Sequence, residues 1–257
     1  MRYSDGATVR RAVIEGRWQS PTRGLARGFV QTGLVAVPER YAADFLLFCS
    51  RNPKPCPVIE VVEKGGISKY AAPGAALWNA LPGYRVYQKG HLIYEGPRID
   101  DYWRNDLVCF LLGCSYSFEY LLEEGGLRLK GNREGRGNPI YVTNRECIPA
   151  GVFRGPLVVS MRPVAADKVS EAVLLSARLP LAHGAPVHIG CPEELGVDLE
   201  KPDFGNRVSI EKNEVPVFWA CSITPQEVAL RSGLDLMITQ SPGHMLVTDL
   251  KVMELLT

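Results

Sequence analysis

At 257 residues the chain is long enough to bury a full core, either as one large domain or as two closely packed lobes. Its 29 basic and 28 acidic residues leave no net field that would attract nucleic acid or an anionic membrane. The seven cysteines show no paired or zinc-type spacing, no apolar run is long enough to span a bilayer, and the first residues lack the apolar segment of a signal peptide. We therefore expect a cytoplasmic protein with reduced thiols and with neither a nucleic-acid nor a membrane partner.

The first elements predicted along the chain form a strand–helix–strand unit. A short helix is expected over residues 10–15 and ends near Gly16. A strand over residues 33–38 then ends in a proline, and a helical spacing of apolar residues follows over 39–50. Residues 58–62 predict the second strand of the unit.

A different pattern occupies the middle of the chain. Residues 84–94 alternate and predict a β-hairpin that turns at Lys89 and Gly90. Residues 102–124 predict a helix, or two helices, interrupted at residues 113–115. Residues 138–143 predict another short strand.

The strand–helix–strand order then returns twice. The second unit comprises residues 157–163, 166–178 and 186–189, and the third comprises 217–223, 224 to about 232, 236–239 and 245–248. Thr224, Pro225 and Glu227 form a capping-box pattern with Thr224 as N-cap. Units of this length favour parallel pairing with right-handed crossovers.

These elements predict an α/β protein with mixed sheets built from β-α-β units and arranged in two closely packed lobes. We assign residues 1–154 to an N-terminal α/β lobe with the hairpin as an insertion at about 66–100. Residues 155–257 form the C-terminal lobe, which we expect to be a two-layer αβ sandwich. The alternative is a single discontinuous unit.

Polar clusters follow the apolar elements at six places, where α/β folds position ligand sites. They are residues 51–57, 113–119, 160–163, 183–188, 221–225 and 241–244. The pattern predicts a site for a small molecule. The basic stretch over residues 128–136 is expected to be a solvated loop, with a substrate-binding loop as the alternative.

The cluster at 113–119 is suited to bind an anion. A helix that starts there would aim backbone N–H groups and the hydroxyls of Ser115 and Ser117 at a carboxylate. Cys114 beside such a helix start would have a lowered pKa and could act as nucleophile or acid. The alternative is a packing site, with Ser117 and Glu119 serving as helix cap and first-turn acid.

Several basic and polar residues are candidates for substrate binding. Arg154 and Arg162 flank a strand, where an arginine can bind a carboxylate through two hydrogen bonds, and an inward role is favoured for Arg162. Asn52 and Lys54 lie in a loop that its prolines make stiff, which suits either a binding site or a rigid connector. The predicted substrate-binding set is Arg162, Lys54, Asn52, Arg154, His183 and Thr224.

The histidines are candidates for acid–base chemistry. His188 and His244 occupy comparable places in the second and third units, so they would converge if their strands were neighbours. Histidines hydrogen-bonded in the core are the main alternative. A metal site with Asp249 or Cys221 is the weakest alternative, and we predict neither a metal nor a cofactor, because the nucleotide-binding and metallopeptidase motifs are absent.

In these clusters and their neighbouring strands the chain resembles the bacterial hydro-lyases, which are similar to the domain found in D-glutamate cyclase. The matching segments are residues 45–57, 110–119, 155–163, 183–190, 216–221 and 241–245, and they span about residues 27–249. The resemblance implies a lyase that removes water from a small carboxylate or amino acid, such as D-glutamate closing to 5-oxo-D-proline. The vertebrate cyclase carries a second domain, for which we expect no counterpart in this chain.

Such a cyclisation needs an anchor for the carboxylate, acid–base groups and donors for an oxyanion. We predict Arg162 or Lys54 as the anchor and His188 or His244 as the acid–base groups. Ser115 and Ser117 are the expected donors, and Glu119 is the alternative base. Two other interpretations stay open: a non-catalytic protein that binds a carboxylate or amino acid, and a cysteine-dependent amidase that uses Cys114 or Cys221. A homodimer is expected for a cytoplasmic enzyme.

Overall fold

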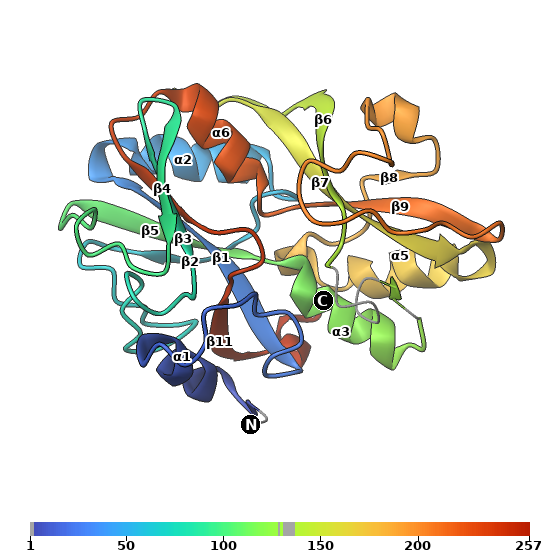
Figure 1. The fold of residues 1–257 in the computed structure, drawn as a ribbon, viewed down its shortest axis with the longest axis horizontal. Coiled ribbons are helices and arrows are strands. Elements are labelled where there is room, and N and C mark those ends of the chain that lie inside the picture. The colour runs from blue at the N-terminus through green and yellow to red at the C-terminus, as the bar shows by residue number, and fades with distance from the viewer. Residues whose placement is uncertain (1–2, 128, 131–136) are drawn as a thin grey trace.

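The structure is a computed structural model that describes residues 3–127, 129–130 and 137–257. Two antiparallel sheets lie side by side in it, and helices pack against them (Figure 1). This arrangement confirms the predicted α/β class and the two closely packed lobes. The basic stretch at 128–136 lies largely outside the described residues. Within the described part of the chain, no helix combines the length and apolar character needed to cross a membrane.

The larger sheet has the strand order β2-β5-β1-β10-β3-β4, and β11 also pairs with β1. Its strands are β1 (Phe29–Pro38), β2 (Val58–Val62), β3 (Tyr84–Gln88), β4 (His91–Gly96), β5 (Leu107–Gly113), β10 (Met237–Gln240) and β11 (Leu246–Lys251). The helices of this lobe are α1 (Gly6–Ile14), which contacts β11, and α2 (Glu39–Arg51), which packs on β1 and β5. The predicted hairpin is confirmed as β3 and β4, and Lys89 and Gly90 have the positive φ angles that a tight hairpin turn requires.

The smaller sheet has the strand order β6-β7-β9-β8. Its strands are β6 (Ile140–Glu146), β7 (Pro156–Ala165), β8 (His188–Ile189) and β9 (Glu214–Ala220). The helices α3 (Ser115–Glu124) and α5 (Val169–Ala177) share an apolar core with one face of this sheet. Because α3 also contacts β1, it lies between the two lobes (Figure 1).

The predicted parallel pairing is wrong, since every strand pair that the structure describes is antiparallel. In each of the first two units a strand from elsewhere in the chain lies between the two strands of the unit: β5 separates β1 from β2, and β9 separates β7 from β8. In the third unit the strands belong to different sheets. The unit order was therefore correct, but sequence spacing cannot reveal an inserted strand.

Two local predictions are also corrected. Residues 107–113 form β5 and not a helix, because a strand buried on both faces is apolar throughout and has no period that distinguishes it from a buried helix. At the start of α6 (Thr224–Ser232) the N-cap is Ile223, so Thr224 is already helical and the predicted capping box is absent.

The sheets do not follow a division of the chain at residues 154 and 155. Strands β10 and β11 come from the last part of the chain, yet they pair with β1 in the larger sheet. Likewise, β3 pairs with β10, so the hairpin continues the larger sheet. The larger lobe is therefore assembled from both ends of the chain.

Candidate active site

The candidate site surrounds the N-terminus of α3, where the two lobes meet. Cys114 is the N-cap of this helix, and Gly113 precedes it at the end of β5. A Cβ atom at Gly113 would lie 1.6 Å from the carbonyl oxygen of Leu181 and 3.4 Å from the Cα atom of Ala182. The absence of a side chain at Gly113 thus allows residues 180–183 to pack directly against the residues that begin α3.

A buried carboxylate on the second turn of α3 organises the site. Glu119 is 3% exposed and accepts hydrogen bonds from Arg23 Nε (2.9 Å), Arg23 Nη2 (2.8 Å) and Arg162 Nε (3.1 Å). Asn138 Nδ2 donates a further bond of 2.7 Å to Glu119, and its own Oδ1 accepts one of 3.0 Å from Arg23. One carboxylate therefore lies between two guanidinium groups.

Arg162 is the most enclosed member of this group, with 1% of its surface exposed. Its guanidinium donates to Ser115 Oγ (2.9 Å) and Ser160 Oγ (3.1 Å), in addition to Glu119. The aromatic rings of Phe118 and Trp219 lie 4.9 and 5.4 Å from its Cζ atom. These contacts hold the planar group in one orientation, which suits it to recognise a planar anion.

The charges of this cluster do not balance. Burial alone would raise the pKa of Glu119, but the charges of Arg162 and Arg23 outweigh it and lower that pKa, so the carboxylate is ionised. Two cations and one anion leave a net charge of about +1 in a buried place. Moreover, Arg23 Nη1 is buried and has no hydrogen-bond partner among the described residues. A second anion, supplied by a ligand, would satisfy both the charge and the free donors.

His183 contributes a second unpartnered atom. Its ring is 1% exposed, and Nδ1 lies 2.6 Å from the backbone oxygen of Lys54. Because a carbonyl oxygen can only accept, Nδ1 carries the proton, and Nε2 keeps a lone pair that accepts no hydrogen bond from any described group. Burial lowers the pKa of His183 to about 4, and the charges of Arg162 and Lys54 add to this effect. The imidazole is therefore neutral, and Nε2 is able to accept a proton.

The thiols of the site differ from what the sequence predicted. Burial raises the pKa of Cys114 to about 11 and that of Cys221 to about 12, so both are protonated at neutral pH. The predicted lowering of the Cys114 pKa by the helix start is wrong, because desolvation of the thiolate outweighs the favourable helix terminus. All seven cysteines are free, and Cys191 is exposed.

We expect iodoacetamide at pH 7.5 to modify Cys191 alone in the native protein, and all seven cysteines once the protein is unfolded. Mass spectrometry of intact protein counts the adducts, and a Cys191→Ser variant should gain none while folded. Rapid modification of Cys114 or Cys221 that a carboxylate ligand slows would contradict this expectation and favour the amidase.

The predicted convergence of His188 and His244 does not occur, because β8 belongs to the smaller sheet and His244 precedes β11 of the larger one. His188 pairs with Phe218 across the strands, on the face opposite to Arg162, and its Nε2 lies 3.0 Å from the backbone oxygen of Cys191. His244 lies beside Gly83, with Nδ1 2.8 Å from the oxygen of Pro242. Both histidines are thus bonded to nearby backbone.

The stiff loop at 51–57 makes backbone contacts. The amide of Asn52 donates to the oxygens of Phe48 and Ile148, and its Oδ1 accepts from Ile148 N. The Lys54 ammonium donates to the oxygen of Ala185. The contribution of this loop to the site is the backbone oxygen of Lys54, which fixes the ring of His183.

The remaining predicted residues are spread over the fold. The hydroxyl of Ser117 accepts a hydrogen bond of 3.1 Å from Gln31 N, and Thr224 Oγ1 accepts one of 3.1 Å from Val158 N. These bonds tie α3 to β1 and α6 to β7. Arg154 is exposed. Of the predicted set, the structure brings together Cys114, Ser115, Glu119, Arg162 and His183.

Sequence reasoning missed Arg23 and Asn138. Arg23 lies in a polar segment near the N-terminus that carries no recognisable motif, and neither residue follows a predicted strand. The one available signal was the position of Asn138 at the start of a predicted strand. Only the long-range contacts to Glu119, 96 and 19 residues away, identify them.

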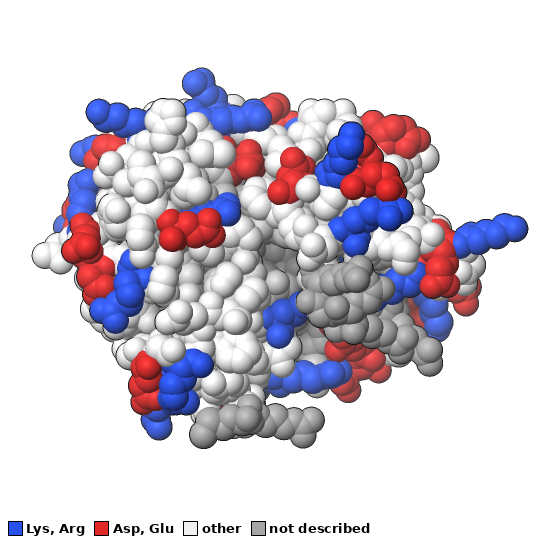
Figure 2. Space-filling view, viewed as in Figure 1, with Lys and Arg blue, Asp and Glu red and all other residues white. Residues whose placement is uncertain are grey.

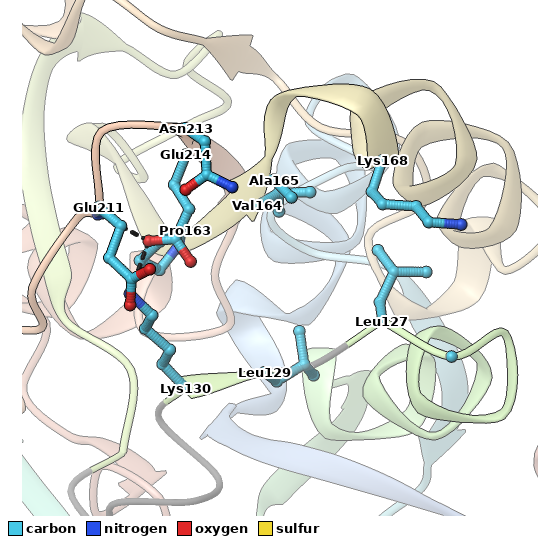
Figure 3. A pocket seen from close by; sticks show the side chains of 11 residues that line it. Leu127, Leu129, Lys130, Pro163, Val164, Ala165, Lys168, Glu211, Asn213 and Glu214 are labelled. Atoms are coloured by element: carbon cyan, nitrogen blue, oxygen red, sulfur yellow. Dashed lines mark hydrogen bonds and ion pairs between the residues drawn. The ribbon is translucent and has the colours of Figure 1, made fainter.

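A cavity of about 410 Å³ lies at the C-terminal end of β7, where Pro163, Val164 and Ala165 line it (Figure 3). Leu127, Leu129 and Val164 line it, and Lys130 reaches across it to Glu211 and Glu214, at 2.9 and 2.6 Å. None of the predicted site residues lines this cavity. Among the described residues, no three His, Cys, Asp or Glu side chains are grouped so that they could hold a metal ion.

The fold and the site together define an α/β protein with a buried arginine–carboxylate centre between two lobes. The model of the family described as D-glutamate cyclase matches residues 108–249. A Rubrobacter xylanophilus protein named "Putative hydro-lyase" is 55% identical over 245 residues, which is 95% of each chain. Another of that name, from Natranaerobius thermophilus, is 48% identical over 96% of this chain and 95% of its own. The chain belongs to the D-glutamate cyclase family, together with these bacterial relatives.

Proposed function

We propose that the chain is a hydro-lyase that removes water from a small amino acid with a carboxylate side chain, with D-glutamate closing to 5-oxo-D-proline as the candidate reaction. The observation that carries this proposal is the unpaired Nη1 of Arg23 in a buried cluster of net charge about +1. D-Glutamate and 5-oxo-D-proline each carry one net negative charge at neutral pH, so both would neutralise the cluster.

The substrate carboxylate would bind between Arg23 and the N-terminus of α3. Arg23 Nη1 offers two N–H donors, and the first backbone N–H groups of the helix add a favourable dipole. Glu119 acts as a positioning residue, since it is ionised and occupied by both arginines. It is therefore unsuited to the role of base that the sequence had offered as an alternative.

Ring closure forms a C–N bond between the amino group and the side-chain carboxyl carbon, and breaks one C–O bond. Two protons must move from the nitrogen to the departing oxygen, which leaves as water. The free lone pair of His183 Nε2 is suited to carry them one at a time. A carboxylate bound at Arg23 would partly cancel the positive field at His183 and raise its pKa, which makes Nε2 a better base in the complex than in the free protein.

Replacing Arg23 by glutamine should lower kcat/KM for D-glutamate about 100-fold, because a charge-assisted contact to the substrate is lost. Chiral chromatography of D-glutamate, L-glutamate and 5-oxo-D-proline measures the turnover. The matched control is Arg27→Gln, since Arg27 is 56% exposed in the same segment and should keep near-native activity. No turnover of any of the three compounds by folded wild-type protein would refute the reaction.

Binding without turnover in the same experiment would favour the non-catalytic alternative. The protonated thiols of Cys114 and Cys221 argue against the amidase.

The free cysteines support the proposal of a reducing compartment such as the cytoplasm. Charges of both signs lie side by side on the face shown in Figure 2, in keeping with a small-molecule ligand and with no nucleic-acid partner. The homodimer stays a prediction.

A further inference from the structure

We propose that Ser222 is a further residue that contacts the substrate, and that Gln240 is the residue that positions it. This inference rests on the proposed function. Ser222 follows β9 in the smaller lobe and is 3% exposed. Its hydroxyl lies beside the thiol of Cys114, close enough to favour the thiolate, but no nitrogen or oxygen of the described residues is its hydrogen-bond partner.

A hydroxyl without a partner in the interior weakens the folded state, because it loses its hydrogen bonds to water and gains none in return. Ser68 shows the usual solution elsewhere in the chain: it is 1% exposed, donates to Glu60 at 2.8 Å and accepts from Ala72 N at 2.9 Å. Among the described residues the hydroxyl of Ser222 has no such nitrogen or oxygen partner, and the thiol of Cys114 beside it is a weak hydrogen-bonding group. An unpartnered donor beside the start of α3 is therefore explained if its partner is the substrate.

The backbone of Ser222 is held by a buried glutamine of the other lobe. Gln240 Nε2 donates to the backbone oxygen of Ser222 at 3.4 Å, while its Oε1 accepts from Leu34 N at 2.8 Å. Gln226 Nε2 in turn donates to the backbone oxygen of Gln240 at 2.9 Å. A Cβ atom at Gly33 would come within 3.0 to 3.1 Å of the Gln240 amide, so a glycine there leaves room for it.

This chain of contacts fixes the backbone of Ser222, and the hydroxyl lies beside Cys114 at the start of α3. Arg23, Arg162 and His183 approach the start of α3 from other segments, and Ser222 approaches it beside Cys114. A neutral O–H donor suits the oxygen that becomes negative when the amine attacks the carboxyl carbon. Ser222 would then donate to that oxygen, while Arg23 holds the carboxylate of the substrate that does not react.

The test compares Ser222→Ala with Ser68→Ala in the full chain. Ser222→Ala should keep or raise the melting temperature, because it removes an unpartnered hydroxyl, yet it should lower kcat for D-glutamate about 100-fold with less than about a threefold change in KM. Ser68→Ala should lower the melting temperature and leave kcat unchanged. Native kcat in Ser222→Ala, or a loss of activity that only parallels a loss of stability, would overturn the inference.

The Gln240→Glu variant tests whether Gln240 positions Ser222 or only stabilises the fold through its hydrogen bond to Leu34 N. The carboxylate can still accept from Leu34 N but cannot donate to the oxygen of Ser222. We expect a lowered kcat, and a Ser222→Ala/Gln240→Glu double variant no slower than Ser222→Ala alone, because Gln240 acts through Ser222. Additive losses would overturn the role of Gln240. Inactive wild-type protein would instead refute the proposed function, whereas active wild type with active Ser222→Ala refutes only this inference.

Discussion

Replacement of Glu119 by glutamine is expected to destabilise the protein by about 3–5 kcal/mol and to abolish turnover of D-glutamate. The substitution keeps the shape but leaves Arg23 and Arg162 buried without a counter-charge, and it turns an amide N–H₂ group toward guanidinium donors. For a chain of this length the loss corresponds to a fall of about 6–20 °C in melting temperature, measurable by calorimetry. Among substitutions in the arginine–carboxylate cluster, this one should affect stability the most.

The matched control is Glu124→Gln on the same helix. Glu124 is 57% exposed and pairs with Arg27 at 3.0 Å, so its loss should cost less than about 1 kcal/mol. A pH series adds a second check. The pKa of Glu119 is lowered from 4.5 in the folded state, so its stabilising effect is present above about pH 4.5 and is lost as the pH falls below that value. The difference between wild type and Glu119→Gln should therefore shrink below pH 4.5, and a difference that does not depend on pH would show that Glu119 is not ionised.

The second large effect is expected for His183→Asn, which should lower kcat about 100- to 10,000-fold. The side-chain amide of asparagine can replace Nδ1–H as donor to the oxygen of Lys54, and asparagine tolerates the φ of 78° found at this position. The variant therefore removes the Nε2 lone pair and preserves the local fold. His188→Asn is the control and should retain activity, because His188 lies on the opposite face of the smaller sheet.

Measuring the free energy of unfolding as a function of pH tests the role of His183 independently of catalytic activity. The pKa of His183 falls from 6.5 to about 4 on folding, so the unfolded chain binds a proton that the folded chain does not between these values. Wild-type stability should therefore decrease as the pH falls from 6.5 to 4, with a contribution from His183 of up to about 3 kcal/mol. His183→Asn should lack this contribution. If the two proteins lose stability in parallel over that range, His183 is not a buried neutral base.

The sequence was informative about local secondary structure and less informative about which strands are neighbours in a sheet. The order of strands and helices in the three units, the β3–β4 hairpin and the inward placement of Arg162 could all be predicted, because each depends on a local pattern. The insertion of β5 between β1 and β2 could not, since antiparallel and parallel neighbours leave the same pattern in a buried strand.

The same limit applies to the site. The residue types of Glu119, Ser115 and His183 identified them as candidates, but their roles depend on partners far along the chain. Arg23 pairs with Glu119 and favours its ionised form, and the carbonyl of Lys54 selects the tautomer of His183. His188 and His244 looked equivalent by spacing, yet His188 lies in β8 of the smaller sheet and His244 lies in the loop before β11 of the larger one. The charge balance around Glu119 and the tautomer of His183 depend on contacts between residues far apart in the sequence. The spacing of residues along the chain does not predict such contacts.

The position of β10 and β11 has a consequence for how the protein is made. During synthesis β1 leaves the ribosome early, but two of its three partners are the last strands to appear. The strands of the smaller sheet lie between residues 140 and 220, so they are all translated before the edge of β1 that faces away from β5 can pair with β10 and β11. A nascent chain stalled near residue 235 would therefore expose one unpaired edge of β1 to other chains and become a substrate for chaperones, although the residues of the candidate site described above had already been translated.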